Sequence, residues 1–359
     1  MRKPINSGAP VVVKVGSSSL AGADGGIDAG GLARAAAAVA TARQLGHPTV
    51  LVSSGAVAAG LPALGMATRP NDIVDLQVAA AVGQGRLMER YSATFDAVNL
   101  VAGQVLLTME VLSNRSQYLN ARAALTRMLG AGIVPVVNEN DTIVVEELRL
   151  GDNDRLAAIV SHLVGAGLLL ILSDTEGLFS ADPRLGEAEL LSAVRHADEL
   201  LDRLSGAGPL GSGGVATKVA AARMAAWSGV PTVVAAASAE RVVERVLKGE
   251  EVGTWVEPRP ERMPARKLWI AFGQPSSGVL VIDDGAVLAL VGASRSLLPV
   301  GIVAVRGSFA AGAAVEVHDA RGQLVAKGIV RMDASSLIAT RGQRSELEAI
   351  HRDDLVVLR

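Results

Sequence analysis

The stretch Ile133-Val134-Pro135-Val136-Val137, followed directly by Asn138-Glu139-Asn140-Asp141, decides the fold. An apolar run rich in β-branched residues predicts a buried strand of a parallel sheet. The polar residues then lie at the carboxyl end of that strand, where open α/β sheets bind ligands. A second cluster, Gly151-Asp152-Asn153-Asp154, follows soon after. Amides and carboxylates at this density suit a ligand with both an ammonium and a carboxylate group, although either cluster alone is also typical of turns and helix caps.

Similar apolar runs, separated by Ala-rich stretches, lie on both sides of this strand. They are residues 11–15, 49–52, 100–107, 168–172 and 231–235. Such alternation is typical of strands that are each followed by a helix. The sequence therefore predicts an α/β fold with a mainly parallel open sheet between two layers of helices.

A change of composition marks a domain boundary near residue 260. Residues 257–264 are rich in proline and charge, which is typical of a linker. Beyond them, glycines separate short β-like runs, at 278–282, 286–290, 302–306, 314–318 and 324–329. This spacing favours a small β-rich barrel or sandwich. We expect a catalytic domain over residues 9–256, a linker over 257–276 and a second domain over 277–356.

The composition excludes several classes of protein. Half of the 359 residues are hydrophobic, enough for a large core, and the net charge of -2 provides no general attraction for nucleic acid or an anionic membrane. Cysteine is absent, which excludes disulfides and thiolate catalysis. The longest apolar stretch, 163–172, is too short to span a bilayer, and the start of the chain is charged too soon for a signal peptide. We expect a cytoplasmic protein without a membrane anchor.

Two lysines in separate segments could contact a phosphate. Lys14 ends an apolar run just before Gly16 and three serines, and Lys218 follows the glycine-rich residues 211–214 at the start of an Ala-rich stretch. Glycines allow the backbone to approach a phosphate closely, and each ammonium adds a fixed charge. A solvated lysine at a strand end is the ordinary alternative for Lys14. The segment Ser53-Ser54-Gly55 predicts a further small-residue loop at the same sheet edge, or simply a capped turn.

The histidines are scattered, so the sequence predicts no metal site built from protein ligands alone. A nucleotide-borne Mg²⁺ needs few protein ligands and stays compatible with the chain. Phosphoryl transfer requires mainly alignment and neutralisation of charge, which two lysines and Mg²⁺ can supply. Residues 173–179 close another strand and could form an adenosine site or an ordinary capped loop.

In this order the motifs resemble the amino acid kinase family, over nearly the whole chain. The residues that carry the resemblance are 13–17, 53–56, 80–84, 119–122, 137–141, 151–154, 177–178, 181–184, 213–214 and 217–218. The resemblance implies the amino acid kinase fold. It also implies that Lys14 and Lys218 flank the transferred phosphoryl group while Asp154 orients both lysines.

The resemblance also implies binding residues for two substrates. Ser54, Gly55, Asp141, Asp152 and Asn153 would line the amino acid pocket. ATP would be held by Lys14, Gly16, Ser173, Asp174, Ser212, Gly213, Gly214, Val215, Ala216, Thr217 and Lys218. The implied reaction is ATP- and Mg²⁺-dependent phosphorylation of the side-chain carboxylate of L-glutamate to L-glutamyl 5-phosphate, the first step of proline biosynthesis.

Alternatives within the family act on aspartate, N-acetylglutamate or carbamate. An alternative from another class is a non-catalytic protein that binds RNA or senses an amino acid. The resemblance further implies feedback inhibition by proline, assembly into dimers or tetramers, and a glutamyl phosphate reductase as a possible partner.

Residues 296–302 and 350–354 resemble the PUA domain, a small β-rich domain that elsewhere binds RNA. Val300 stands where relatives commonly have a basic residue, and aromatic residues are scarce beyond Phe309. The segment therefore has few side chains that could stack on bases or contact phosphates, which argues against RNA binding here.

Overall fold

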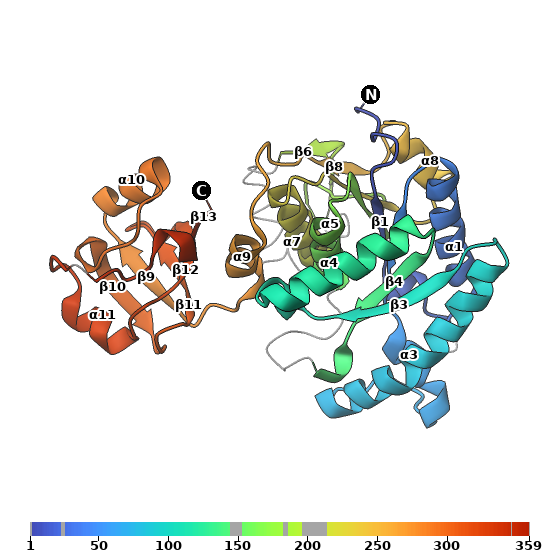
Figure 1. Cartoon of the computed structure of the whole chain (residues 1–359), viewed down its shortest axis with the longest axis horizontal. Coiled ribbons are helices and arrows are strands. Elements are labelled where there is room, and N and C mark those ends of the chain that lie inside the picture. Colours follow the sequence, from blue (N-terminus) through green and yellow to red (C-terminus); the bar gives the residue numbers. More distant parts are fainter. Residues whose placement is uncertain are drawn as a thin grey trace. The chain divides into compact units, whose positions relative to one another are not determined.

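The computed structural model describes residues 2–22, 26–143, 153–181, 186–195, 214–345 and 347–358. It divides into two compact units, Met1–Arg262 and Met263–Arg359, coloured blue to gold and orange to red in Figure 1. Within the described residues, no helix has the length and apolar character needed to cross a membrane.

The first unit is built on an eight-stranded sheet with the order β3-β4-β2-β1-β5-β7-β8-β6. Its strands are β1 (Val11–Val15), β2 (Thr49–Val52), β3 (Ala102–Leu107), β4 (Val134–Glu139), β5 (Leu168–Ser173), β6 (Ala193–Val194), β7 (Thr232–Ala236) and β8 (Thr254–Val256). The neighbouring strands are parallel except for the antiparallel pair β7 and β8. The predicted mainly parallel sheet is confirmed.

Helices cover both faces of this sheet (Figure 1). On one face lie α1 (Ala29–Gln44), α3 (Ile73–Asp96) and α8 (Val242–Leu247), which share one hydrophobic core with the strands. On the other lie α4 (Arg115–Gly130), α5 (Asn153–Val164) and α7 (Gly214–Trp227), where α5 packs against both neighbours. The shorter elements are η1 (Ser17–Ser19), α2 (Ala56–Gly60), η2 (Pro62–Leu64), η3 (Met109–Leu112) and η4 (Asp141–Ile143).

Side-chain alternation along β1 directs Lys14 toward α5 and α7. All five residues of β1 are buried, and Val11, Val13 and Val15 join the core on the α1 face. Because successive side chains of a strand point to opposite faces, Lys14 points to the α5 and α7 layer. The helices begin at defined caps; for example, the Asp28 carboxylate accepts hydrogen bonds from the N–H groups of Gly30 and Gly31 at the start of α1.

The second unit contains one five-stranded sheet with the order β10-β9-β11-β12-β13. Its elements are α9 (Ala265–Leu268), η5 (Trp269–Gly273), β9 (Gly278–Ile282), α10 (Asp284–Ala293), η6 (Pro299–Gly301), β10 (Ile302–Gly307), β11 (Ala314–His318), β12 (Leu324–Ile329), α11 (Ala334–Thr340), η7 (Arg352–Asp354) and β13 (Leu355–Val357). A β-rich second domain is confirmed. The expected β-run at 286–290 is wrong, because this stretch lies in α10, whose first turn is capped by the carboxylate of Asp283 on the N–H of Ala286.

Candidate active site

Lys14, Asp154 and Lys218 come together at the carboxyl edge of the first sheet. Lys14 Nζ lies 2.5 Å from Asp154 Oδ1, and Lys218 Nζ lies 3.8 Å from Asp154 Oδ2. Lys14 is 5% exposed, Asp154 is 3% exposed, and the Lys218 side chain is 15% exposed. The expected grouping of two ammonium groups around one carboxylate is present in the structure.

Each member of this cluster comes from a different element. Lys14 is the fourth residue of β1, Asp154 lies in the first turn of α5, and Lys218 lies in the first turns of α7. Thr217 Oγ1 donates a 2.7 Å hydrogen bond to Asp154 Oδ2, which ties α7 to α5. Gly214 leaves room for the second lysine, because a Cβ there would stand only 3.2 Å from Lys218 Nζ.

The charges of the cluster keep Asp154 ionised. Burial by itself raises the pKa of this carboxyl group. The ammonium groups of Lys14 and Lys218, together with the hydrogen bonds from Lys14 and Thr217, outweigh burial and lower the pKa below its ordinary value. The site therefore holds one carboxylate between two cations, an excess of positive charge that suits a phosphate.

The amide of Asn153 organises a polar network beside this cluster. Its Nδ2 donates to the Ser53 carbonyl at 2.8 Å, to Ser54 Oγ at 2.9 Å and to Asn138 Oδ1 at 3.0 Å. Asn153 Oδ1 is buried and has no hydrogen-bond partner among the described residues. A buried acceptor of this kind suits a ligand that brings its own donor, such as an ammonium group.

The loop after β2 supplies Ser54 to this network, and Gly55 follows it. Ser54 is buried, and Gly55 has the left-handed φ of 103°, which turns the chain into α2. Ser53 Oγ lies 2.8 Å from the hydroxyl of Tyr91 on α3. Register places the loop next to the first lysine, because Lys14 pairs with Val52 and Ser53 follows directly.

Asp141 lies past the end of β4, in η4. Burial raises the pKa of its carboxyl group to about 6, against an opposing effect of the nearby Arg69. The structure thus gives Asp141 a half-buried position at the same sheet edge, with Arg69 as its charged neighbour.

Ser173 is the last residue of β5, the neighbour of β1 on the side away from β2, and Asp174 follows it. Val15 pairs with Leu172, so Ser173 lies beside Gly16. Ser173 is buried and donates to Asp174 Oδ1 at 3.0 Å, whereas Asp174 is exposed. Val215 and Ala216 are half-buried in the first turn of α7. The expected site residues Asp152, Ser212 and Gly213 lie outside the described residues.

Two residues without an assigned role extend this hydrogen-bond network, namely Asn138 and Gln84. Asn138 Nδ2 donates to Gln84 Oε1 at 2.7 Å, and Asn138 Oδ1 accepts from Asn153 and from the N–H of Glu139. Asn138 follows the opening apolar run, so its place at the sheet edge was a usable signal. Gln84 comes from the distant helix α3, and no local pattern indicates that it reaches Asn138.

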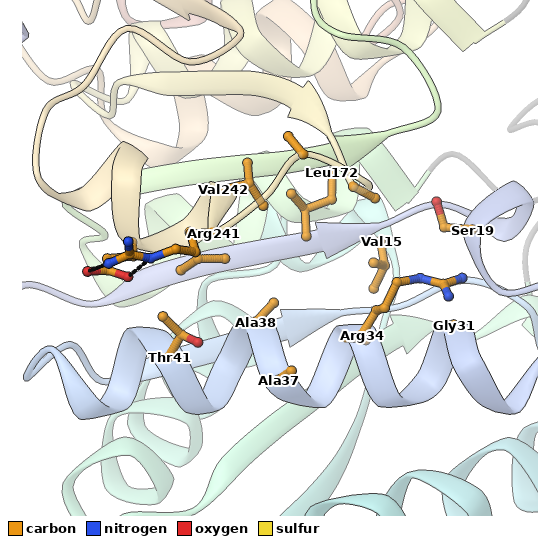
Figure 2. Close-up of a pocket in the computed structure, with 15 residues that line it drawn as sticks. Val15, Ser19, Gly31, Arg34, Ala37, Ala38, Thr41, Leu172, Arg241 and Val242 are labelled. Atoms are coloured by element: carbon orange, nitrogen blue, oxygen red, sulfur yellow. Dashed lines mark hydrogen bonds and ion pairs between the residues drawn. The ribbon is translucent and has the colours of Figure 1, made fainter.

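The described residues contain no group of three or more His, Cys, Asp or Glu side chains that could hold a metal ion. A separate cavity of about 290 Å³ lies between α1 and α8. Figure 2 shows Ala37 and Ala38 facing Val242 and Leu172 across it, with Arg34 and Arg241 at its sides. Both arginines are already paired, with Asp28 and Glu244, and none of the expected site residues lines this cavity.

Comparison with known proteins shows the family to which the chain is similar. Residues 9–236 match the amino acid kinase family, and residues 278–351 match the PUA domain. The chain is 45% identical to the glutamate 5-kinase of Marinomonas sp. (strain MWYL1), with all of both chains covered. It is 46% identical to the glutamate 5-kinase of Frankia casuarinae, with 100% of this chain and 99% of that protein covered. The crystal structure of UMP kinase from Bacillus anthracis, 15% identical, matches with a TM-score of 0.50 over 70% of this chain and 97% of that one, which shows a shared fold.

Proposed function

Because the chain belongs to the amino acid kinase family, and within it to the glutamate 5-kinases, we propose that the cluster of Lys14, Asp154 and Lys218 catalyses phosphoryl transfer to glutamate. The reaction is ATP-dependent phosphorylation of the side-chain carboxylate of L-glutamate, in proline biosynthesis. The observation that carries the assignment of residues is the buried carboxylate shared by two ammonium groups.

In the reaction, a side-chain carboxylate oxygen of glutamate forms a bond to the γ-phosphorus of ATP while the bond from that phosphorus to ADP breaks. No base is needed, because the glutamate carboxylate is already ionised at neutral pH. Lys14 and Lys218 neutralise charge on the moving phosphoryl group, and Asp154 holds both lysines at their positions.

The amino acid pocket is proposed to consist of Ser54, Gly55, Asp141, Asp152 and Asn153. The free Oδ1 of Asn153 and the carboxylate of Asp141 suit the ammonium group of glutamate. Asn138 and Gln84 support this pocket by fixing the orientation of the Asn153 amide.

The nucleotide is proposed to bind along β1, β5 and α7. Gly16 lies close to the first lysine, since a Cβ there would be in van der Waals contact with Lys14 Nζ at 3.5 Å, and Ser173 lies beside Gly16. Asp174 and residues 212–217 complete the proposed ATP site. Both oxygens of Asp154 are already engaged by cations, so Mg²⁺ would be held mainly by ATP phosphates and water, and it would add positive charge at the γ-phosphate.

We further propose a catalytic domain over 9–256, a linker over 257–276 and a PUA domain over 277–356. The enzyme is proposed to act in the cytoplasm as a dimer or tetramer, to be inhibited by proline, and to pass its product to a glutamyl phosphate reductase. The second domain is not proposed to bind RNA, because Val300 and the scarcity of aromatic residues suit it poorly to that role.

The direct test is ATP-dependent hydroxamate formation with L-glutamate, Mg²⁺ and hydroxylamine, which traps an acyl phosphate. Aspartate, N-acetylglutamate and carbamate are tested in parallel as alternative substrates. A signal with glutamate alone supports the proposal. A signal with another acid would reassign the substrate, and silence with all of them in folded protein that binds ATP would indicate a sensor.

A further inference from the structure

A short segment, Arg259–Arg262, contacts the carboxyl-terminal ends of the two helices that carry the catalytic cluster. Asp154 lies in the first turn of α5, and Thr217 and Lys218 lie near the start of α7. Both helices precede parallel strands, so they run side by side with both amino-terminal ends at the active site. Their far ends, roughly 20 Å away, are where the segment binds.

The two far ends have matching caps. Each helix is followed by a glycine with left-handed φ, Gly165 at 62° and Gly229 at 71°. The carbonyl three residues before each glycine accepts from the glycine N–H, His162 O at 3.3 Å and Ala226 O at 3.0 Å. Terminal helix carbonyls of this kind have spare capacity for a second donor.

The segment supplies that second donor at both caps. Arg262 Nη2 donates to the carbonyl of His162, and the backbone N–H of Arg259 donates to the carbonyl of Ala226 at 2.9 Å. The Arg259 guanidinium also lies 3.9 Å from the ring centroid of Trp227, the last residue of α7. Cations at helix carboxyl ends are favourable, and a cation over an indole adds to this.

Arg262 itself lies between the two caps. A Cβ on Gly165 would be 3.6 Å from Arg262 Nη1, and a Cβ on Gly229 would be 3.6 Å from Arg262 Cβ. One side chain thus contacts the end of α5 and the end of α7. The two helices pack against each other, and Ala157 and Ala158 of α5 and Ala221, Ala222 and Ala225 of α7 are fully buried.

We infer that Arg259 and Arg262 are positioning residues for phosphoryl transfer, which fix the alignment of α5 against α7 and through it the distance between Asp154 and Lys218. This inference rests on the proposed function. The distance at stake is the 3.8 Å between Lys218 Nζ and Asp154 Oδ2, which a small slide of either helix changes. Arg262 is the last residue of the first unit, and Met263 begins the second.

The test compares Arg262→Ala and Arg259→Ala with the matched control Arg2→Ala. Arg2 also donates to backbone carbonyls, those of Val252, Gly253 and Ser192 at 2.6 to 2.7 Å, and its guanidinium lies 5.8 Å from the Trp255 ring. Its partners lie beside β8 rather than on α5 or α7. Arg262→Ala should lower kcat by about tenfold with the glutamate KM changed less than about twofold, because misplacement of reacting groups acts on kcat. Arg2→Ala should leave kcat unchanged.

A double-mutant cycle separates positioning from general stabilisation. Thr217→Val removes the hydrogen bond that joins α7 to Asp154 at the active-site end. Distant independent sites have additive effects, within a factor of about two. In the double variant Arg262→Ala with Thr217→Val, kcat should differ by at least about threefold from the value expected when the effects of the two single variants are combined. In the double variant Arg2→Ala with Thr217→Val, the two effects should be additive.

Arg262→Lys keeps the cation and should recover part of the lost kcat. If Arg262→Ala does not fold, Arg262→Gln, which keeps hydrogen-bond donors, replaces it in the cycle. Equal kcat in the Arg262 and Arg2 variants, or additivity with Thr217→Val, would overturn the inference while wild-type hydroxamate formation stands. No hydroxamate from wild-type protein would instead refute the proposed function.

Discussion

Lys14 Nζ and Asp154 Oδ1 lie 2.5 Å apart in a site where both side chains are almost fully buried. The pair joins the central strand β1 to the first turn of α5, and the second oxygen of the same carboxylate faces Lys218 at 3.8 Å. Removal of the carboxylate charge would leave two buried or partly buried cations facing each other without compensation.

Asp154→Asn should therefore reduce both turnover and stability. We expect kcat to fall by about a hundredfold or more, and the free energy of unfolding to fall by about 3 kcal/mol. Denaturant unfolding and the hydroxamate assay measure the two effects. Glu244→Gln is the control, because Glu244 also lies between two cations, Arg241 and Lys248, but its partners are exposed and it lies outside the cluster. Unchanged kcat in Asp154→Asn would contradict the assigned role.

The stability difference between wild type and Asp154→Asn should depend on pH in one direction. The folded-state pKa of Asp154 is lowered, so its stabilising contribution is complete above the unfolded pKa of about 4. Below that pH the unfolded carboxylate takes up a proton first, and the contribution is lost progressively as the pH falls through the lowered folded-state pKa. Unfolding midpoints from pH 3 to pH 8 should converge only at the acid end.

The glutamate KM should depend on pH through the carboxyl group of Asp141. Because burial raises its pKa to about 6, the carboxylate needed for the substrate ammonium is progressively protonated below that pH. The glutamate KM should rise by up to about tenfold per pH unit below 6, and fall to a plateau above it. Asp141→Asn should have a raised KM at pH 8 and a flat profile from pH 5 to pH 8. An unaltered pH profile in Asp141→Asn would assign the ionisation to another group.

Gly83 and Gly85, two residues apart on α3, form a matched pair. A Cβ on Gly83 would stand 1.8 Å from the backbone oxygen of Ala56, the first residue of α2, whereas a Cβ on Gly85 meets nothing within 4 Å. Gly83→Ala should destabilise the fold by about 3 kcal/mol and raise the glutamate KM, because α2 begins at the Ser54–Gly55 loop. Gly85→Ala should stabilise the fold by about 0.5–1 kcal/mol. Similar unfolding midpoints for the two variants would contradict this packing.

The sequence predicted the sheet because each central strand carries a mainly apolar run, and residues 134–137 of the run at 133–137 lie in the buried strand β4. The prediction of a β-run at 286–290 was wrong, because the alanine and leucine residues there favour a helix that begins at the Asp283 cap. Local pattern indicated Lys14 and Lys218 as phosphate contacts and Asp154 as part of a polar cluster, whereas the role of Asp154 in orienting both lysines came from the resemblance.

The missed contacts join residues far apart in the chain. Asn138 meets Gln84 on α3, and Thr217 bonds to Asp154, across separations of 54 and 63 residues. Local periodicity does not predict such pairs, because they depend on how the helices pack against the sheet.

Substitution of Lys218 and of Asn153 should affect different kinetic constants, because the two side chains contact different groups. Lys218 contacts Asp154 and the Gly214 carbonyl at 3.0 Å, while Asn153 holds Ser54 and Asn138. Loss of an ammonium that acts on the moving phosphoryl group removes stabilisation specific to the transition state, so Lys218→Ala should lower kcat by about a hundredfold with the glutamate KM nearly constant. Asn153→Ala should mainly raise the glutamate KM.

Lys248→Ala is the control for loss of a lysine, because Lys248 forms an exposed pair with Glu244 away from the cluster. It should match wild type in both constants. A raised glutamate KM with unchanged kcat in Lys218→Ala would mean that this lysine binds substrate and transition state equally, and the charge that drives transfer would then have to come from Lys14 and the nucleotide-borne metal alone.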